Sequence, residues 1–225
     1  MSEKKEEERT YKVVLVGESG VGKTCIINQF VNETFEPETL PTQGTKFSKK
    51  KLDLDKESIN FNIWDTPGLR KYHDFAKIFY KGATSFILVY DVTSQNSFDE
   101  LKNYWYNEIK NLENEKKLVI AVAANKSDLY EKKEVSNEEG EKFAYEIGAI
   151  FGITSAKTNT GIQALFDNIG RKILDPNFDY ADNEKKMKDN SENKMRVEEK
   201  TEKKPILTSP VKKCCGLENC KNCFK

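Results

Sequence analysis

The sequence lacks a long apolar run, an excess of either charge and any regular spacing of cysteines. No apolar run approaches the roughly 20 residues that a helix needs to span a bilayer, and no hydrophobic signal segment opens the chain. Basic and acidic residues both number 37, so overall charge gives no reason to expect nucleic acid as a partner. Four of the five cysteines crowd into residues 214–223, unlike a disulfide framework. We therefore expect the reducing cytosol as the default compartment.

Polar residues are concentrated at the two ends of the chain. A length of 225 residues suggests one domain plus a tail. Residues 181–204 carry eight Lys or Arg and seven Asp or Glu with almost no large apolar side chain, too polar to offset the entropy lost on ordering. We expect a disordered, mixed-charge N-terminal arm over residues 1–9, a folded domain over 10–175 and a disordered tail over 176–225 that contains the cysteine cluster.

Residues 17–24 read Gly-Glu-Ser-Gly-Val-Gly-Lys-Thr, the G-x-x-x-x-G-K-[ST] pattern of a phosphate-binding P-loop. A β-branched strand is predicted before it, over 12–16, and a helix after it, over 25–31. Glycines let the backbone approach a phosphate closely, and the helix N-terminus adds a partial positive charge. Lys23 would neutralise the β- and γ-phosphates, and the Thr24 hydroxyl would bind Mg²⁺. The alternative is a Gly-rich turn that binds nothing.

The rest of the sequence alternates strands with helices. Strands are predicted over 45–54, 59–64, 85–90, 118–124 and 149–153, and helices over about 75–81, 97–113, 136–147 and 161–174. A short turn near Asp55 would pair the first two of these strands antiparallel, whereas the unbroken apolar strands indicate a parallel sheet covered on both faces. We therefore predict an α/β fold with a mostly parallel six-stranded sheet, one antiparallel edge strand and helices on both faces. Ligands of such sheets bind beyond the strand carboxyl ends.

Asp65 and Gly68, which follow the strand predicted over 59–64, indicate how the metal and the phosphate would be bound. Asp65 follows the strand directly, where a carboxylate could reach the Mg²⁺ bound by Thr24, usually through water. Its alternative is a strand-end Asp that caps a turn. Gly68, three residues further on, could donate its backbone N–H to a γ-phosphate.

A base-reading motif follows the buried strand predicted over 118–124. Residues Asn125, Lys126, Ser127 and Asp128 form N-K-x-D. The Asp128 carboxylate can accept hydrogen bonds from N1–H and the 2-amino group of guanine, two donors that adenine lacks. After the last short strand, a backbone N–H could meet the guanine O6 from one of Ser155, Ala156 and Lys157.

Together these motifs resemble a small GTPase of the Ras superfamily, most of all the Rab family. The resemblance covers residues 11–174 and rests on GESGVGKT, FEPETLPTQGTKF, WDTPG, YKGATSFILVYDVT, ANKSD and TSAK. It implies the P-loop NTPase (Ras-like) fold and a switch that binds GTP or GDP with Mg²⁺, hydrolyses GTP and acts in vesicle and membrane traffic. It implies effectors, an exchange factor, a GTPase-activating protein and a prenylation escort as partners. N-K-S-D and the lack of a lid insert disfavour a P-loop kinase or ATPase.

The resemblance also implies roles for single residues. Phe35 would pack beside the base, and Thr42 would close over Mg²⁺ and the γ-phosphate. The implied nucleotide-binding residues are Gly17, Ser19, Gly20, Val21, Gly22, Lys23, Thr24, Cys25, Phe35, Thr42, Gly68, Asn125, Lys126, Asp128, Ser155, Ala156 and Lys157. The implied metal ligands are Thr24, Thr42 and Asp65. Phe47, Trp64 and Phe79 would form an effector surface, with core packing as the alternative.

Leu69 departs from the family pattern. After Asp-Thr the family has Ala-Gly-Gln, and its Gln orients the attacking water, whereas this sequence has Pro67, Gly68 and Leu69. Leu has no donor or acceptor, so we predict weak intrinsic hydrolysis and name no catalytic residue. His73 could be a substitute or simply a solvated side chain. The alternative function is a GTP-locked scaffold with little turnover, and an activating protein could also supply the missing groups in trans.

The cysteine cluster near the C-terminus resembles a Rab prenylation site. Cys214 and Cys215 would carry the lipid, although ten residues follow them and the last residues form no C-a-a-X box. Palmitoylation is an alternative. A zinc knuckle that adds Cys220 and Cys223 is disfavoured, because adjacent cysteines splay apart and the spacing is tight. Lipidation would hold the protein at the cytoplasmic face of intracellular membranes, with a cytosolic pool.

Overall fold

The computed structural model describes residues 9–37, 40–55, 57–69, 72, 77–113 and 118–180. All of these belong to the first of the two units into which the chain divides, Met1–Tyr180. The predicted N-terminal arm up to residue 8, His73 and the four cysteines of the tail lie outside the described residues. Within them, no helix combines the length and the apolarity that crossing a membrane requires.

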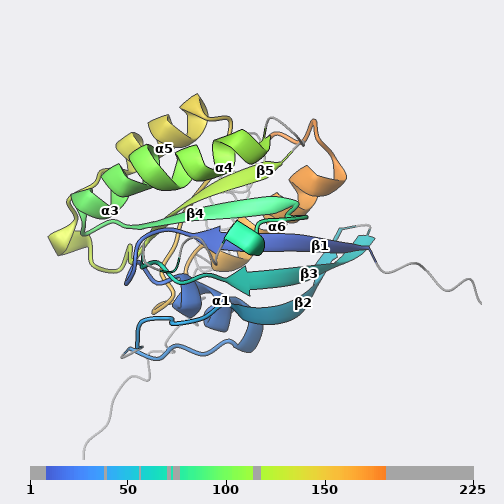
Figure 1. Ribbon diagram of the computed structural model, residues 1–225, viewed down its shortest axis with the longest axis horizontal. Coiled ribbons are helices and arrows are strands. Elements are labelled where there is room, and N and C mark those ends of the chain that lie inside the picture. Colours follow the sequence, from blue (N-terminus) through green and yellow to red (C-terminus); the bar gives the residue numbers. More distant parts are fainter. Residues whose placement is uncertain are drawn as a thin grey trace, which may run out of the picture. The chain divides into compact units, whose positions relative to one another are not determined.

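A single six-stranded sheet in the order β2-β3-β1-β4-β5-β6 forms the centre of the domain (Figure 1). Its strands are β1 Thr10–Val16, β2 Lys46–Leu54, β3 Glu57–Asp65, β4 Ser85–Asp91, β5 Val119–Asn125 and β6 Ile150–Ile153. β2 pairs antiparallel with β3, and every other pair is parallel. The predicted sheet with its one antiparallel edge strand is therefore confirmed.

Helices cover both faces of the sheet, as expected. They are α1 Lys23–Asn32, α3 Gln95–Glu100, α4 Tyr106–Glu113, α5 Asn137–Glu146 and α6 Ile162–Leu174. A π-helical turn, Leu101–Trp105, joins α3 to α4, and a short 3₁₀ turn spans Tyr130–Lys132. Figure 1 shows α3 and α4 in front of β4 and β5, with α1 and α6 behind the sheet.

Two predicted helices differ in detail from the observed ones. The helix expected over 97–113 begins two residues earlier, because Ser94 accepts a hydrogen bond from the Ser97 N–H and caps it. The same helix widens into the π-helical turn, which the apolar spacing did not indicate. The helix expected over 75–81 lies partly outside the described residues. In its described part the helix ends at Ile78, and hydrogen-bonded turns lead on to β4.

Alternation along the central strands divides the core into two clusters. Residues such as Val13, Leu15 and Ile87 face α1 and α6. Their chain neighbours, such as Val14 and Phe86, face α3, α4 and α5. Because both faces of these strands are buried, the strands read as unbroken apolar runs.

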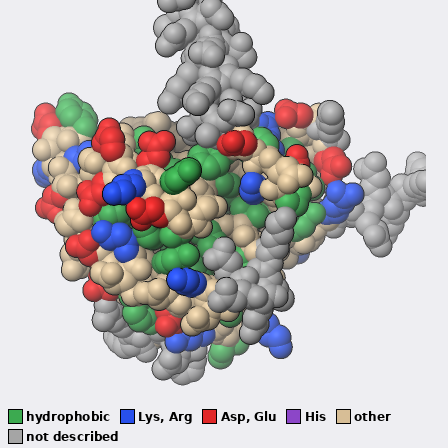
Figure 2. Space-filling view, turned by 90° about the horizontal axis from the view of Figure 1, so that it is seen from above, with side chains coloured by type: hydrophobic (Ala, Val, Ile, Leu, Met, Phe, Trp, Pro, Cys, Tyr) green, Lys and Arg blue, Asp and Glu red, His purple; other side chains and the backbone are tan. Residues whose placement is uncertain are grey.

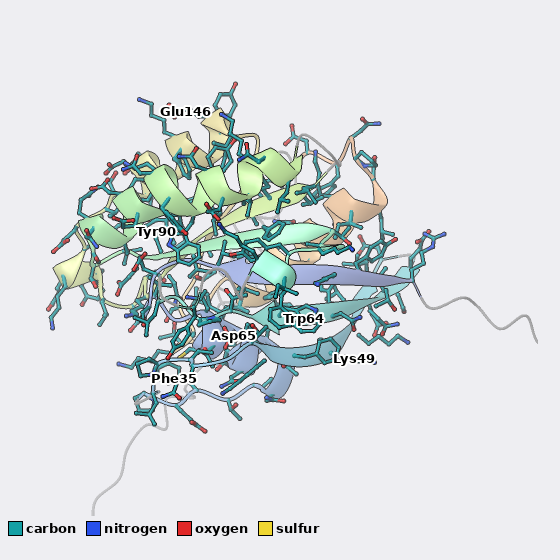
Figure 3. All side chains as sticks on the ribbon, viewed as in Figure 1. Phe35, Lys49, Trp64, Asp65, Tyr90 and Glu146 are labelled. Carbon is teal, nitrogen blue, oxygen red and sulfur yellow. The ribbon has the colours of Figure 1, made fainter. Side chains whose placement is uncertain are left out.

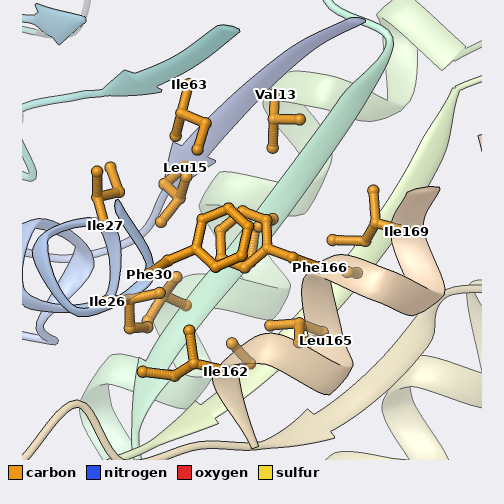
Figure 4. Close-up of a cluster of buried hydrophobic side chains, with 14 of the residues drawn as sticks. Val13, Leu15, Ile26, Ile27, Phe30, Ile63, Ile162, Leu165, Phe166 and Ile169 are labelled. Carbon is orange, nitrogen blue, oxygen red and sulfur yellow. The ribbon is translucent and has the colours of Figure 1, made fainter. Parts of the chain in front are cut away.

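The first cluster holds α1 and α6 together behind the sheet. Phe30 of α1 stacks on Phe166 of α6, with ring centroids 3.7 Å apart and planes inclined by 7° (Figure 4). Both rings are almost fully buried, and stacked rings contribute roughly 0.5–1.5 kcal/mol beyond their area burial. This contact fixes the position of α1, which begins at the P-loop.

The surface has no single-sign charge field on the face seen from above the view of Figure 1. Acidic and basic side chains are interspersed there (Figure 2), in keeping with their equal numbers in the sequence. Any positively or negatively charged patch on this face is therefore a small local group of residues.

Candidate nucleotide-binding site

A cavity of about 380 Å³ opens beyond the carboxyl ends of the parallel strands. Its lining residues come from five segments of the sequence: the P-loop with the start of α1, the stretch before β2, Gly68 after β3, the end of β5 with the loop that follows it, and the loop after β6. The implied nucleotide-binding residues all line it except Gly17, Val21 and Ser155. Four further lining residues escaped sequence reasoning: Pro37, Leu40, Pro41 and Leu129. Three of them lie in a stretch without hydrophobic periodicity, which left no signal, and the fourth directly follows N-K-S-D.

The P-loop at residues 17–24 and Thr42 form what we term the phosphate end of the cavity, and Asp65 contacts it through its hydrogen bond with Thr24 without lining the cavity itself. Gly22, the N-cap of α1, has a φ of 96°. A side chain there would also collide with the Asn125 amide, so both backbone and space require glycine. The bare backbone is therefore a cradle that an anion can approach.

Lys23 lies at the centre of the phosphate end. Its Nζ donates to the carbonyl oxygens of Gly17 at 2.7 Å and Glu18 at 2.9 Å. Burial lowers the pKa of Lys23 to about 8, while the nearby Asp65 and Glu18 carboxylates oppose that shift. A phosphate group beside it would further favour the charged form.

Three side-chain oxygens from separate segments meet beside Lys23. The Thr24 Oγ1 donates to the Asp65 Oδ2 at 2.6 Å and lies 2.9 Å from the Thr42 Oγ1. Figure 3 shows Asp65 at the end of β3, between Trp64 and Phe35 in the view. Burial raises the pKa of Asp65, although the hydrogen bond from Thr24 opposes this. The other carboxylate oxygen, Oδ1, is buried without a hydrogen-bond partner among the described residues. Hard oxygen donors with one unsatisfied carboxylate oxygen fit Mg²⁺.

The loops after β5 and β6 form the base end of the cavity, residues 125–128 and 154–157. Asn125 lines the cavity and also forms hydrogen bonds with two neighbouring loops. Its Nδ2 donates to the Val21 carbonyl at 2.8 Å, and its Oδ1 accepts from the Thr154 hydroxyl at 3.2 Å. Asn125 therefore ties the P-loop to the loop after β6, so the two ends of the cavity are linked by one buried amide.

The other two residues of the N-K-x-D motif are held by side chains outside it. Asp128 accepts a hydrogen bond from the Ser155 hydroxyl at 2.6 Å. Lys126, in the left-handed region with φ 63°, forms an ion pair with Asp91 at 2.7 Å. Ser155 therefore donates a hydrogen bond to Asp128 and does not itself line the cavity. The ion pair of Lys126 with Asp91 was not predicted from the sequence.

Gly68 and Leu69 follow β3 at the phosphate end. Gly68 packs so closely on the Glu18–Ser19 peptide that any side chain would collide with it. Leu69 is half-buried. The Glu18 carboxylate in turn accepts a hydrogen bond from the indole N–H of Trp105 at 3.1 Å. This link between the P-loop and the π-helical turn had no sequence signal, because the two residues are 87 positions apart.

The three aromatic residues implied as an effector surface lie side by side. The Phe47 and Trp64 ring centroids are 5.1 Å apart, and those of Trp64 and Phe79 are 5.2 Å apart. Phe47 is 46% exposed and the other two are half-buried. The alternative of core packing therefore describes Phe47 poorly, since nearly half of its surface faces solvent.

The family model for the Ras family matches residues 12–175 of this sequence. The chain belongs to the Ras family. Among similar proteins, Rab-31 of Homo sapiens is 40% identical over 170 residues, which cover 75% of this chain and 86% of that protein. Rab-31 of Rattus norvegicus is 39% identical over the same length and coverage. Rab-8B of Pongo abelii is 36% identical over 166 residues, 73% of this chain and 78% of that protein.

These similarities confirm the fold and the activity that the motifs indicated. The chain is a Rab-like small GTPase of the Ras superfamily that functions in membrane traffic. It binds GTP and GDP with Mg²⁺ and hydrolyses GTP to GDP and phosphate. Membership of this family supports effectors and regulators of the usual kinds, and the related Rab proteins are associated with intracellular membranes.

Proposed function

We propose that the cavity binds the guanine nucleotide and Mg²⁺ through the residues named from the sequence, and that this GTPase hydrolyses GTP slowly without a partner. The observation that carries the assignment is the meeting of Thr24, Thr42 and Asp65. Their oxygens come from three segments and converge beside a buried lysine. A bound Mg²⁺ would supply positive charge between the phosphates and these oxygens.

At the phosphate end, binding exchanges contacts. The Lys23 Nζ now donates to two backbone carbonyls, and we infer that it turns to the β- and γ-phosphates when they are present. Thr24 would likewise exchange its hydrogen bond to Asp65 for a bound Mg²⁺. Thr42 lies on the segment before β2, so its contact with Thr24 closes that segment over the cavity.

At the base end, the contacts are already made. Asp128 is positioned by Ser155 to accept from N1–H and the 2-amino group of guanine. Phe35 and the aliphatic part of Lys126 line the same part of the cavity, where they would pack against the base. The backbone N–H groups of residues 155–157 would meet the guanine O6.

Leu69 supports the proposal of slow intrinsic turnover. It offers no polar atom to orient the attacking water, a task that Gln performs in related GTPases. A GTPase-activating protein would then have to supply the missing polar group in trans. Nucleotide release, and not chemistry, would be governed by an exchange factor.

The remaining proposals concern the ends of the chain. We propose residues 10–175 as the GTPase domain, preceded by the arm 1–9 and followed by the tail 176–225 as a tether. Lipid on Cys214 and Cys215, delivered with a prenylation escort, would hold the protein at the cytoplasmic face of membranes, with a cytosolic pool. Fractionation tests this: replacing both cysteines with Ser should move the protein to the soluble fraction, and continued membrane association would exclude them as the anchor.

Competition binding tests the assignment of the cavity. GTP and GDP should displace a fluorescent guanine nucleotide in the presence of Mg²⁺, whereas ATP should fail at far higher concentrations. Chelating Mg²⁺ should accelerate nucleotide release from the wild-type protein. Equal displacement by ATP and GTP would contradict the role of Asp128, and release unaffected by chelation would contradict the metal role of Thr24, Thr42 and Asp65.

A further inference from the structure

Glu18, the second residue of the P-loop, makes contacts in two directions. Its backbone carbonyl accepts a hydrogen bond from the Lys23 Nζ at 2.9 Å. Its carboxylate accepts one from the indole N–H of Trp105, at the end of the π-helical turn, at 3.1 Å. Among the described residues, no ion pair joins Glu18 to Lys23. The residue therefore lies beside the phosphate-binding ammonium group while its carboxylate is bonded to Trp105.

The negative charge of Glu18 nevertheless acts on Lys23. Burial lowers the pKa of Lys23, and the Glu18 carboxylate is one of two groups that oppose this shift by favouring the charged form. Glu18 is only half-buried, so packing does not enclose its side chain on all sides. Because the Lys23 Nζ already contacts this residue's own carbonyl, a released carboxylate could turn to the same ammonium group. There it would compete with phosphate, since both are negatively charged.

Trp105 is suited to hold the carboxylate because its own ring is fixed by packing. The side chain is 1% exposed and belongs to the second core cluster together with Leu101 and Ile109. The Tyr106 N–H bonds to the carbonyl of Leu101, five residues back, so the turn holds one residue more than an α-helical turn. Such turns are rare inside α-helices and occur frequently at functional sites. The indole N–H is therefore a donor whose position the core determines.

We propose that Trp105 is a positioning residue whose indole N–H holds the Glu18 carboxylate away from Lys23 and so leaves that ammonium group to the γ-phosphate of GTP. The inference rests on the proposed phosphate-binding role of Lys23 and adds the residue that keeps this lysine available. Trp105 is not among the residues that line the cavity, so it acts through Glu18 and not by touching the nucleotide.

The backbone of Glu18 is held independently of its side chain. Gly68 packs directly on the Glu18–Ser19 peptide, where any side chain at position 68 would collide with it. The Lys23 ammonium group also holds the Glu18 carbonyl. Loss of the Trp105 hydrogen bond would therefore change where the carboxylate lies and leave the path of the P-loop as it is.

The alternative is that the hydrogen bond between Trp105 and Glu18 only stabilises the fold. The two explanations differ in their dependence on charge. A bond that only stabilises the fold would matter equally for GDP and GTP. The proposal instead requires a carboxylate at position 18, because only a charged side chain can take Lys23 from the phosphate.

The experiment measures the affinities of the full chain for GDP and for a non-hydrolysable GTP analogue, both with Mg²⁺, by titration calorimetry. Trp105→Phe keeps a large ring without the N–H and should weaken the GTP analogue about three- to fivefold more than GDP, the size of one partly exposed ion pair. In a Glu18→Gln background the same substitution should leave the ratio of the two affinities unchanged, because an amide forms no ion pair with Lys23. Ile109→Val is the matched control, since it perturbs the same core cluster and keeps both Trp105 and Glu18.

Benzothienylalanine at position 105 replaces the indole N–H by sulfur in a ring of the same shape. It should produce the same shift in the affinity ratio and provides the test if Trp105→Phe does not fold. A ratio that neither replacement changes, or that changes equally in both backgrounds or in Ile109→Val, would overturn the proposal. Those outcomes leave the proposed function standing as long as the wild-type protein binds GTP and GDP with Mg²⁺ and rejects ATP, whereas loss of that selectivity would contradict the assignment of the cavity itself.

Discussion

The base end and the phosphate end of the cavity differ in how their polar side chains are partnered. At the base end, Asp128 is held by Ser155, and Asn125 by both Val21 and Thr154. At the phosphate end, the hydrogen bonds of Lys23 within the described residues go to carbonyls of its own loop, and one Asp65 oxygen has no hydrogen-bond partner among these residues. We infer that the base end is preorganised, and we propose that the phosphate end would exchange contacts on ligand binding.

This difference separates two properties of the switch. A preorganised base end selects guanine at little cost in ordering, because its side chains are already fixed before binding. A phosphate end that must rearrange can respond to the presence or absence of the γ-phosphate. Substitutions at the base end should therefore change which base binds, and those at the phosphate end should change the preference for GTP over GDP.

The largest effect is expected at Asp128. Asp128→Asn replaces the acceptor carboxylate by an amide, so guanine affinity should fall by about a hundredfold or more, since a paired polar site discriminates strongly. Xanthine nucleotides, which present an acceptor in place of the 2-amino group, should gain. Competition binding with XDP and GDP measures this, and Asp99→Asn on the exposed side of α3 is the control. Unchanged guanine preference would mean that the base end does not read the base through Asp128.

The next largest effect is expected at Thr24. Thr24→Asn removes the hydroxyl that meets Asp65 and Thr42, so GTP affinity should fall at least about tenfold, or about 1.4 kcal/mol, and more than GDP affinity. Titration calorimetry with GDP and a GTP analogue measures the two losses. Thr158→Asn introduces the same change outside the cavity lining and should alter neither. Equal losses for both nucleotides would remove the distinction between the two ends.

A smaller effect, on rate and not on affinity, is expected at Leu69. Leu69→Gln supplies an amide that can orient water, so intrinsic hydrolysis should rise about tenfold, equivalent to about 1.4 kcal/mol of barrier. Single-turnover phosphate release measures the rate, and Leu69→Asn, with an amide one methylene shorter, tests whether reach matters. A wild-type rate equal to that of Leu69→Gln would show that another group already performs the task.

The smallest effect is expected where the P-loop meets the π-helical turn. Trp105→Phe keeps a large ring but removes the hydrogen bond to the half-buried Glu18, which should lower the free energy of unfolding by about 1 kcal/mol. Denaturant unfolding of the GDP-bound protein measures the loss. If the hydrogen bond is the cause, the loss of unfolding free energy caused by Trp105→Phe should be smaller in a Glu18→Ala background, which lacks the acceptor. Equal losses of unfolding free energy in both backgrounds would assign the effect to ring packing alone. Trp64→Phe, at the other tryptophan, is the control for the change in fluorescence signal.

Sequence reasoning located the cavity because its residues directly follow strands. Thr24 and Asp65 could be predicted to bind the same Mg²⁺, because parallel strands end at one edge of the sheet. The apolar runs of the sequence predicted those strands. The same reasoning predicted that Asp128, which follows the end of a parallel strand, lies at this edge of the sheet and contacts the base. It could not show that Asn125 bonds to the P-loop or that Ser155 holds Asp128, because those contacts depend on loop conformations that no local pattern encodes.

The sequence by itself determined the family, the mostly parallel six-stranded sheet with its one antiparallel edge strand, and most residues that line the cavity. These depend on short-range patterns: apolar runs, glycine spacing and the motifs after strands. The tertiary structure alone decided the hydrogen bond from Trp105 to Glu18 and the positions of Lys12 over the Trp64 ring and of Lys49 over the Phe47 ring. Such contacts depend on the register between strands and on helix packing, which join side chains that are distant in sequence and carry no shared local signal.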